Sequence, residues 1–130
     1  MDLVIRGRNV VLPDSTGARS IHVRGGVIHS VLGYDEVGDD CELIEAGEDS
    51  VVMPGLVDTH VHVNSPGRTE WEGFQSATAA AAAGGTTTLI DMPLNSIPAT
   101  TTLAAFRTKV DEARGKCFVD VGFWGGVVPG

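Results

Sequence analysis

The sequence is poor in aromatic and basic residues, and both shortages restrict its function. Phe, Trp and Tyr make up 5% of the 130 residues, and 9 Lys and Arg stand against 17 Asp and Glu, giving a net charge of −8. A nucleic-acid-binding surface needs clustered basic residues to neutralise phosphates, often with aromatic rings on which bases stack. We therefore expect no nucleic-acid partner.

Cysteines and long apolar segments are also scarce. Cys41 and Cys117 lie far apart and match neither a zinc-knuckle nor a Cys-x-x-Cys spacing. No apolar run approaches the roughly 20 residues that span a bilayer. The first residues also lack the charged-then-apolar order of a signal peptide. These features predict free thiols, a cytoplasmic location and no membrane partner.

The residues that are present divide the chain into two segments. Residues 1–53 hold short β-like runs separated by turn residues, and Gly25-Gly26 between two such runs predicts a hairpin. Residues 54–130 alternate strand-like and helix-like stretches in the order βαβαβ, which is typical of a parallel α/β structure. An alanine run at 79–83 favours a helix that packs close to a sheet, and Gly84-Gly85 predicts its end.

The expected elements follow from these patterns. In the first segment they are strands at 3–5, 10–12, 21–24, 27–32 and 51–53, a turn at 13–17 and an acidic loop at 35–42. In the second they are strands at 56–63, 86–91 and 117–124 and helices at 70–83 and 101–114.

The strongest chemical signal is Asp58-Thr59-His60-Val61-His62 at the end of the first predicted strand of the second segment. Residues two apart on a strand point to the same side, so His60 and His62 can aim two imidazoles at one metal ion. Asp58 lies two residues before His60 and therefore points to the same side of the strand. Its carboxylate can orient an imidazole ring by hydrogen bonding to it without binding the metal itself. A bare His-x-His also arises from ordinary surface alternation, but the apolar flanks here favour the metal site, since buried imidazoles need partners.

Other candidates are weaker. His22 and His29 stand among alternating residues of the first segment, which predicts surface or edge positions. Asp91, at the end of the second predicted strand, is better explained as a structural group than as a ligand. Arg68 and Asn95 fall in the loops after the first two strands, where each is either a substrate contact or a solvated loop residue. The glycine pairs fit no Gly-x-Gly-x-x-Gly fingerprint, so nucleotide binding by that route is not supported.

The polar groups at the strand ends decide between two parallel folds. In a (β/α)₈ barrel the carboxyl ends of the strands form the active-site face, and a complete barrel takes about 250 residues. Three strands cannot close one. The predicted fold class is therefore α/β: the first three strands of a truncated TIM-type barrel, preceded by a β-rich segment, which the family resemblance given next implies to be part of a small β-rich composite domain.

Four stretches carry a resemblance to a known family. Residues 54–62, Pro-Gly-Leu-Val-Asp-Thr-His-Val-His, resemble the first barrel strand of the amidohydrolase superfamily. Within its cyclic amidohydrolase branch, three further stretches are similar to the allantoinases: Ser-Pro-Gly-Arg-Thr-Glu-Trp-Glu-Gly-Phe at 65–74, Ala-Ala-Ala-Ala-Gly-Gly-Thr-Thr-Thr at 80–88 and Met-Pro-Leu-Asn-Ser-Ile-Pro-Ala-Thr at 92–100.

The resemblance implies a site that this chain holds only in part. It implies two zinc ions, with His60 and His62 on the more buried one, a bridging carboxylated lysine, two further histidines and a late aspartate. It also implies ring opening of the cyclic ureide allantoin to allantoate, a homo-oligomeric full-length form, and Arg68 and Asn95 on the substrate side. Neither Lys109 nor Lys116 stands where the bridging lysine belongs, so we expect the 130-residue chain alone to be inactive.

Two alternatives remain open at this stage. One is a segment of a dihydropyrimidinase or dihydroorotase type of cyclic amidase. The other is a non-catalytic truncated product that acts, if at all, by binding a partner.

Overall fold

The computed structural model describes residues 2–129, which form two compact units that divide between Pro54 and Gly55. No helix in this described range is long and apolar enough to cross a membrane.

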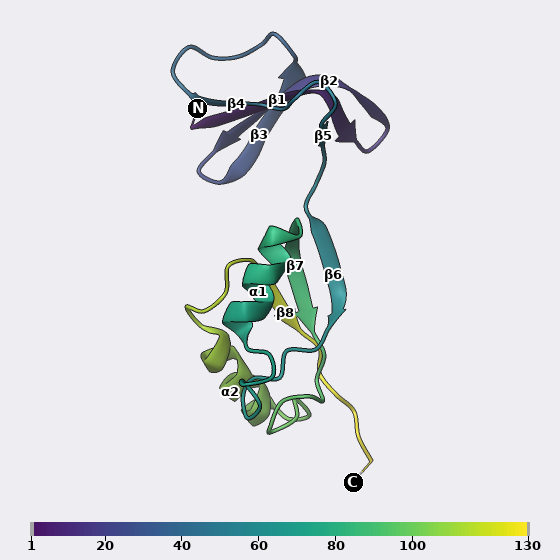
Figure 1. The fold of residues 1–130 in the computed structure, drawn as a ribbon, viewed down its shortest axis with the longest axis vertical. Coiled ribbons are helices and arrows are strands. Elements are labelled where there is room, and N and C mark those ends of the chain that lie inside the picture. The colour runs from purple at the N-terminus through teal and green to yellow at the C-terminus, as the bar shows by residue number, and fades with distance from the viewer. Residues whose placement is uncertain (1, 130) are drawn as a thin grey trace. The chain divides into compact units, whose positions relative to one another are not determined.

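The first unit is a five-stranded sheet (Figure 1). Its strands are β1 (Leu3–Leu12), β2 (Ser15–Arg24), β3 (Val27–Gly33), β4 (Glu42–Glu45) and β5 (Val51–Val52). The order is β3-β2-β1-β4. β5 also pairs with β1, at Asn9 and Val10, which lie further along β1 than the residues that pair with β4. β1 runs antiparallel to β2 and parallel to β4 and β5, so the long first strand holds the unit together.

The hairpin prediction is confirmed, and several boundaries differ from the expectation. Gly25 and Gly26 have φ angles of +57° and +75°, which glycine adopts without a Cβ clash. The two short strands expected at 3–5 and 10–12 are one strand, because a register shift between Gly7 and Val10 absorbs the irregular middle. The predicted turn at 13–17 is shorter, since β2 begins at Ser15, and the pairing of β4 with β1 was not predicted.

The prediction of a surface position is wrong for His22 and confirmed for the exposed His29. His22 is 6% exposed, and its Nε2 lies 3.1 Å from Ser20 Oγ and 2.9 Å from the carbonyl oxygen of Glu36. A buried imidazole needs such partners. His22 therefore has a structural role in the first unit.

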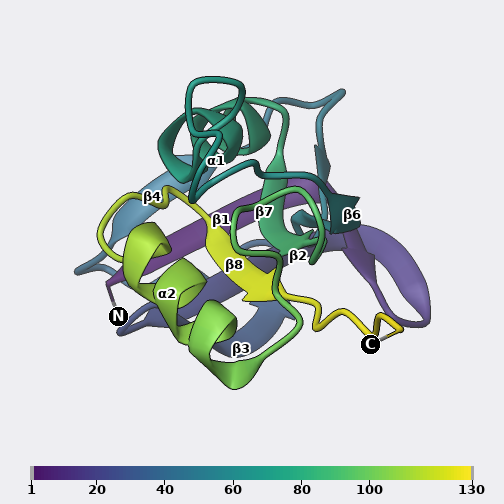
Figure 2. The same ribbon diagram turned by 90° about the horizontal axis from the view of Figure 1, so that it is seen from below.

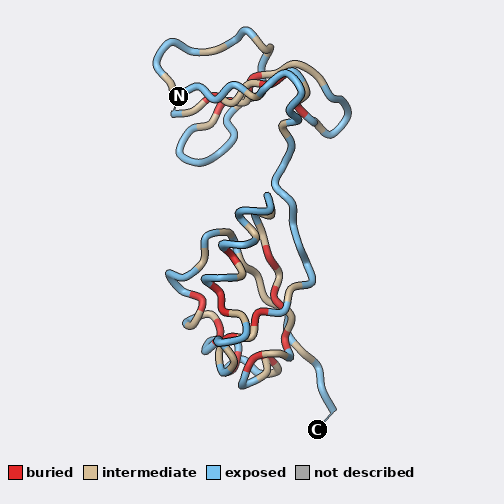
Figure 3. Tube along the Cα trace, viewed as in Figure 1, coloured by how far each residue is buried: buried red, intermediate tan, exposed pale blue. Residues whose placement is uncertain are grey.

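The second unit is a three-stranded parallel sheet of order β6-β7-β8, with both helices packed on the same side (Figures 1 and 2). Its elements are β6 (Leu56–Val61), α1 (Phe74–Ala83), β7 (Thr86–Asp91), α2 (Leu103–Ala113) and β8 (Asp120–Phe123). Val63, Phe74 and Ala113 form the buried cluster between sheet and helices, and the ring of Phe123 packs edge-on against Phe74. Figure 3 shows buried stretches, in red, along the chain of the second unit.

The predicted elements of the second unit are all present, but most are shorter than expected. α1 begins at Phe74 and not at residue 70, because the preceding turn leads into Gly73, whose N–H donates to the Ser76 hydroxyl at 3.3 Å. α2 begins after Thr102, whose hydroxyl accepts the N–H of Ala105 at 3.2 Å. β8 covers only Asp120–Phe123, and β6 ends two residues before the expected Val63.

Candidate metal centre

His60 and His62 lie together at the end of β6. Their ring centroids are 5.2 Å apart, with an interplanar angle of 61°. Two imidazoles on one tetrahedral zinc ion, with each nitrogen at about 2.0–2.1 Å, have ring centres about 5 Å apart. The spacing of the two rings therefore fits a shared metal ion.

The two imidazoles lie on the face of the sheet that the helices leave uncovered. Val61 and Val63 pack against the core between sheet and helices, whereas His60 and His62 are exposed. Successive residues of an extended chain point to opposite sides, so the valines and histidines alternate across the strand. The open face is where further ligands can approach.

Asp58 contacts the backbone at this strand end. Its Oδ1 accepts the backbone N–H of His60 at 3.0 Å, where the pairing of β6 with β7 shifts register between Asp58 and Val61. The carboxylate thus stabilises the irregular strand end. A role for Asp58 in orienting an imidazole ring stays a prediction.

Two imidazoles make an incomplete zinc site. Within residues 2–129 no three His, Cys, Asp or Glu side chains gather where they could hold a metal ion. Zinc sites use three or four protein ligands. The pair can therefore serve as part of a metal centre whose remaining ligands lie elsewhere.

Asp91 connects the histidine strand to the rest of the second unit. Its Oδ1 accepts a hydrogen bond from the N–H of Val63 at 2.8 Å, and its Oδ2 accepts a hydrogen bond from Lys109 Nζ at 2.7 Å. Burial raises the pKa of the Asp91 carboxyl, and the bonds from Lys109 and Val63 oppose that rise. Both carboxylate oxygens are engaged, one by the Val63 backbone and one by Lys109, which agrees with a structural group and leaves neither oxygen directed at the histidine face.

Lys109 is the important residue that sequence reasoning missed. Its side chain is 1% exposed, and Nζ also donates to the carbonyl oxygen of Met92 at 3.2 Å. A signal was present in the sequence. Lys109 stands between Ala105 and Ala113 at intervals of four, on the buried face of α2. A lysine on such a face needs a buried anionic partner.

The loops after β6 and β7 contact each other, and they carry both predicted substrate residues. Asn95 donates from Nδ2 to Oδ1 of Asn64 at 3.2 Å. The guanidinium carbon of Arg68 lies 5.2 Å from the centre of the Trp71 ring. Both side chains are half-buried within these loops. The structure brings Asn95 to the residue two places beyond His62, while Arg68 is held by a neighbour in its own loop.

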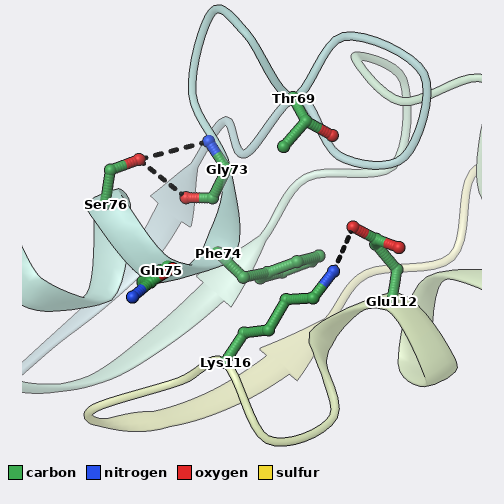
Figure 4. Close-up of a pocket in the computed structure, with 7 residues that line it drawn as sticks. All are labelled: Thr69, Gly73, Phe74, Gln75, Ser76, Glu112 and Lys116. Atoms are coloured by element: carbon green, nitrogen blue, oxygen red, sulfur yellow. Dashed lines mark hydrogen bonds and ion pairs between the residues drawn. The ribbon is translucent and has the colours of Figure 1, made fainter.

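A cavity of about 350 Å³ in the second unit does not include the histidines (Figure 4). Its lining residues are Thr69, Gly73, Phe74, Gln75, Ser76, Glu112 and Lys116. The Lys116 ammonium lies 2.5 Å from Glu112 Oε1, so the main charges of the lining neutralise each other. None of these residues belongs to β6, and the cavity is not part of the candidate metal centre.

Comparison with known proteins identifies the family of the chain. Residues 51–129 match the model of the amidohydrolase family, so the chain belongs to that family of enzymes. More particularly, it is 55% identical to an allantoinase of Streptomyces avermitilis over 130 residues and 50% identical to a mitochondrial allantoinase of Aquarana catesbeiana over 127 residues. These matches cover 99% and 97% of the chain but only 29% and 26% of the two relatives.

Solved structures show the same relationship. An L-hydantoinase (dihydropyrimidinase) of Arthrobacter aurescens is 34% identical, with a TM-score of 0.86 over 99% of this chain and 28% of its own. A dihydropyrimidinase of Brevibacillus agri is 31% identical, with a TM-score of 0.79 over 98% of this chain and 27% of its own. The chain thus spans little more than a quarter of the proteins it resembles, and it corresponds to an amino-terminal portion of an allantoinase-like protein.

Proposed function

We propose that this chain is the amino-terminal part of a cyclic amidohydrolase that opens the ring amide of allantoin to give allantoate. The observation that carries the proposal is the pair of imidazoles at the end of β6, 5.2 Å between ring centres, in a chain 55% identical to an allantoinase. By itself the chain is inactive, because two imidazoles do not complete a hydrolytic metal site.

His60 and His62 would hold one divalent metal ion, which we propose to be the more buried of two zinc ions. When bound, such an ion polarises a carbonyl oxygen and activates a water molecule. The chain's own contribution is to fix the two ring positions through β6 and through the bond between Val63 and Asp91.

Arg68 and Asn95 are proposed to contact the substrate. Both stand in loops that follow strand ends near His60 and His62, and Asn95 is already linked to Asn64. A cyclic ureide presents carbonyl oxygens and N–H groups, which an amide and a guanidinium group can bind.

The proposal also includes the fold and the oligomeric state of the full-length protein. The second unit would be the first βαβαβ part of a TIM-type barrel, with the histidine face inside and the helices outside, as its one-sided helix packing suggests. The first unit would be part of a small β-rich composite domain, and the full-length form a homo-oligomer.

A dihydropyrimidinase or hydantoinase activity is the second candidate. The similarity to the Arthrobacter aurescens L-hydantoinase, with a TM-score of 0.86, favours it. Sequence identity favours allantoin, since the allantoinase of Streptomyces avermitilis is 55% identical and the L-hydantoinase is 34% identical.

A chimera tests the choice between the two substrates. Residues 1–130 would replace the matching segment of the Streptomyces avermitilis allantoinase, and the rates of ring opening would be measured with allantoin, a hydantoin and dihydrouracil. We expect allantoin to be opened at least about tenfold faster, a difference of about 1.4 kcal/mol in transition-state binding.

The matched control is the same chimera carrying His62→Ala, which should lose the activity. Comparable rates on dihydrouracil would move the assignment to the dihydropyrimidinases. A folded chimera that opens none of the three rings would contradict the proposal.

A further inference from the structure

The backbone around His62 is held on both sides by the end of β7. On one side the carbonyl oxygen of Val61 accepts the N–H of Met92 at 2.7 Å. On the other side the N–H of Val63 donates to Asp91 Oδ1 at 2.8 Å. The first bond joins two backbone groups, whereas the acceptor of the second is the Asp91 side chain. A substitution can therefore remove only the second bond.

The Asp91 carboxylate is itself fixed in place. Its second oxygen accepts from Lys109 Nζ at 2.7 Å, and the two side chains are 0% and 1% exposed. The backbone carbonyl of Asp91 accepts the N–H of Trp124 at 2.9 Å, which ties the residue after β8 to the same point. Asp91 is therefore held through its side chain by Val63 and by Lys109 of α2, and through its backbone by Trp124.

A buried ion pair is often replaced by apolar residues with no loss of stability, because its attraction only offsets the desolvation of both groups. The bond from Val63 has a different consequence, because it holds the backbone directly after His62. Groups that hydrogen-bond to a ligating side chain change metal affinity by about 10–100-fold when removed, and we expect a bond that holds the backbone beside a ligand to act in the same direction.

We propose that Asp91, held by Lys109, is a positioning residue that sets the metal affinity of the His60–His62 pair through the N–H of Val63. This inference rests on the proposed metal centre. It adds that Lys109 of α2 stabilises that centre by holding Asp91. The pair acts through the backbone, since both carboxylate oxygens are engaged away from the histidine face.

Two double variants separate positioning from stability. Asp91→Asn with Lys109→Met removes both charges and keeps an amide oxygen that can accept the N–H of Val63. Asp91→Leu with Lys109→Met removes both charges and the acceptor, with a side chain of similar size. The two variants have the same charge and a similar size, and they differ in the acceptor for the N–H of Val63 and in the amide NH₂ group that Asn adds, so they form a matched pair for that bond.

The measurement is a zinc titration of the 130-residue chain, followed by the NMR signals of the two imidazole rings, beside thermal unfolding. We expect the Asn double variant to keep the zinc affinity of the unaltered chain within about twofold, and the Leu double variant to bind at least about tenfold more weakly. Equal zinc affinity in the two variants would overturn the proposal.

A second measurement needs no substitution. The N–H of Val63 in the unaltered chain should exchange with solvent much more slowly than that of the exposed Gly125. Exchange at the same rate would overturn the proposal even where the Leu variant does not fold. His60→Ala and His62→Ala serve as references: unchanged zinc binding in both would reject the metal centre itself, whereas their loss of zinc with equal affinity in the two double variants would reject only the role of Asp91.

Discussion

The indole Nε1 of Trp124 donates to the carbonyl oxygen of Thr59 at 3.0 Å, across 65 residues of sequence. Trp124 follows β8, and Thr59 precedes His60 in β6. Although β7 lies between these two strands, the indole reaches past it. This contact links the strand that carries the histidines directly to the last strand of the sheet.

Replacing Trp124 by Phe should lower the free energy of unfolding by about 0.5–1.5 kcal/mol, because a smaller aromatic ring takes the place of the indole and the N–H donor is lost. Denaturant unfolding followed by circular dichroism would measure the change. Trp71→Phe is the control, since Trp71 is 68% exposed and its ring stacks on Arg68. An effect of Trp71→Phe as large as that of Trp124→Phe would count against the role of the indole bond.

His60→Ala and His62→Ala should each weaken zinc binding by more than about tenfold, because a single imidazole then remains on the open face of the sheet. Calorimetric titration with zinc would measure the affinity. His29→Ala, which removes an exposed histidine of the first unit, should leave it unchanged. An equal loss in all three variants would show that zinc binds histidines without a built site.

The single substitution Lys109→Met should lower the free energy of unfolding by about 3–5 kcal/mol, because it leaves the buried carboxylate of Asp91 without its cation. Combining it with Asp91→Asn should restore most of the loss, since no uncompensated charge then remains. Thermal unfolding of the single and double variants would test this. A double variant no more stable than the single one would contradict the charge argument.

The first unit should lose stability in acid partly through Glu45. Hydrogen bonds from Tyr34 and Arg6 hold the pKa of its carboxyl below the ordinary value of 4.5. A carboxyl with a lowered pKa in the folded state contributes stability that is present above its ordinary pKa and is lost as the pH falls through the lowered one. Glu45→Gln should therefore reduce stability at neutral pH and flatten its fall below about pH 4.5.

Acid unfolding of Glu45→Gln beside Glu42→Gln, a neighbour on the same strand β4, would measure this difference. The prediction fails if both variants follow the pH dependence of the unaltered chain.

The 130-residue chain should show no turnover of allantoin above that of zinc alone. Catalysis by a metal-activated water requires a firmly held ion, and the described residues supply two imidazoles and no third neighbouring ligand. The measurement is loss of allantoin with purified chain and added zinc. Turnover that disappears in His60→Ala would show that a further ligand completes the site, and would contradict this prediction.

The sequence alone determined the order of elements and the histidine pair. The βαβαβ order follows from β-branched runs, the alanine-rich stretch and glycine stops, and local propensity is enough to specify them. His60 and His62 could be placed on one face because strand periodicity is a local property of the backbone. Boundaries such as the start of α1 at Phe74 were not predictable, because they depend on which side chain binds the end of the helix.

Only the tertiary structure decided what supports the site and which histidine is buried. Lys109 and Asp91 are 18 residues apart, and the spacing of Lys109 from the alanines of α2 indicates a buried face but does not identify its partner until α2 packs on the sheet. His22 likewise finds its partner in a distant segment, since its Nε2 lies 2.9 Å from the carbonyl oxygen of Glu36, 14 residues later in the sequence. Such partners come from distant segments, and burial favours their pairing strongly, since an unpaired polar group inside the protein costs about 1–3 kcal/mol of a total stability of about 5–15 kcal/mol.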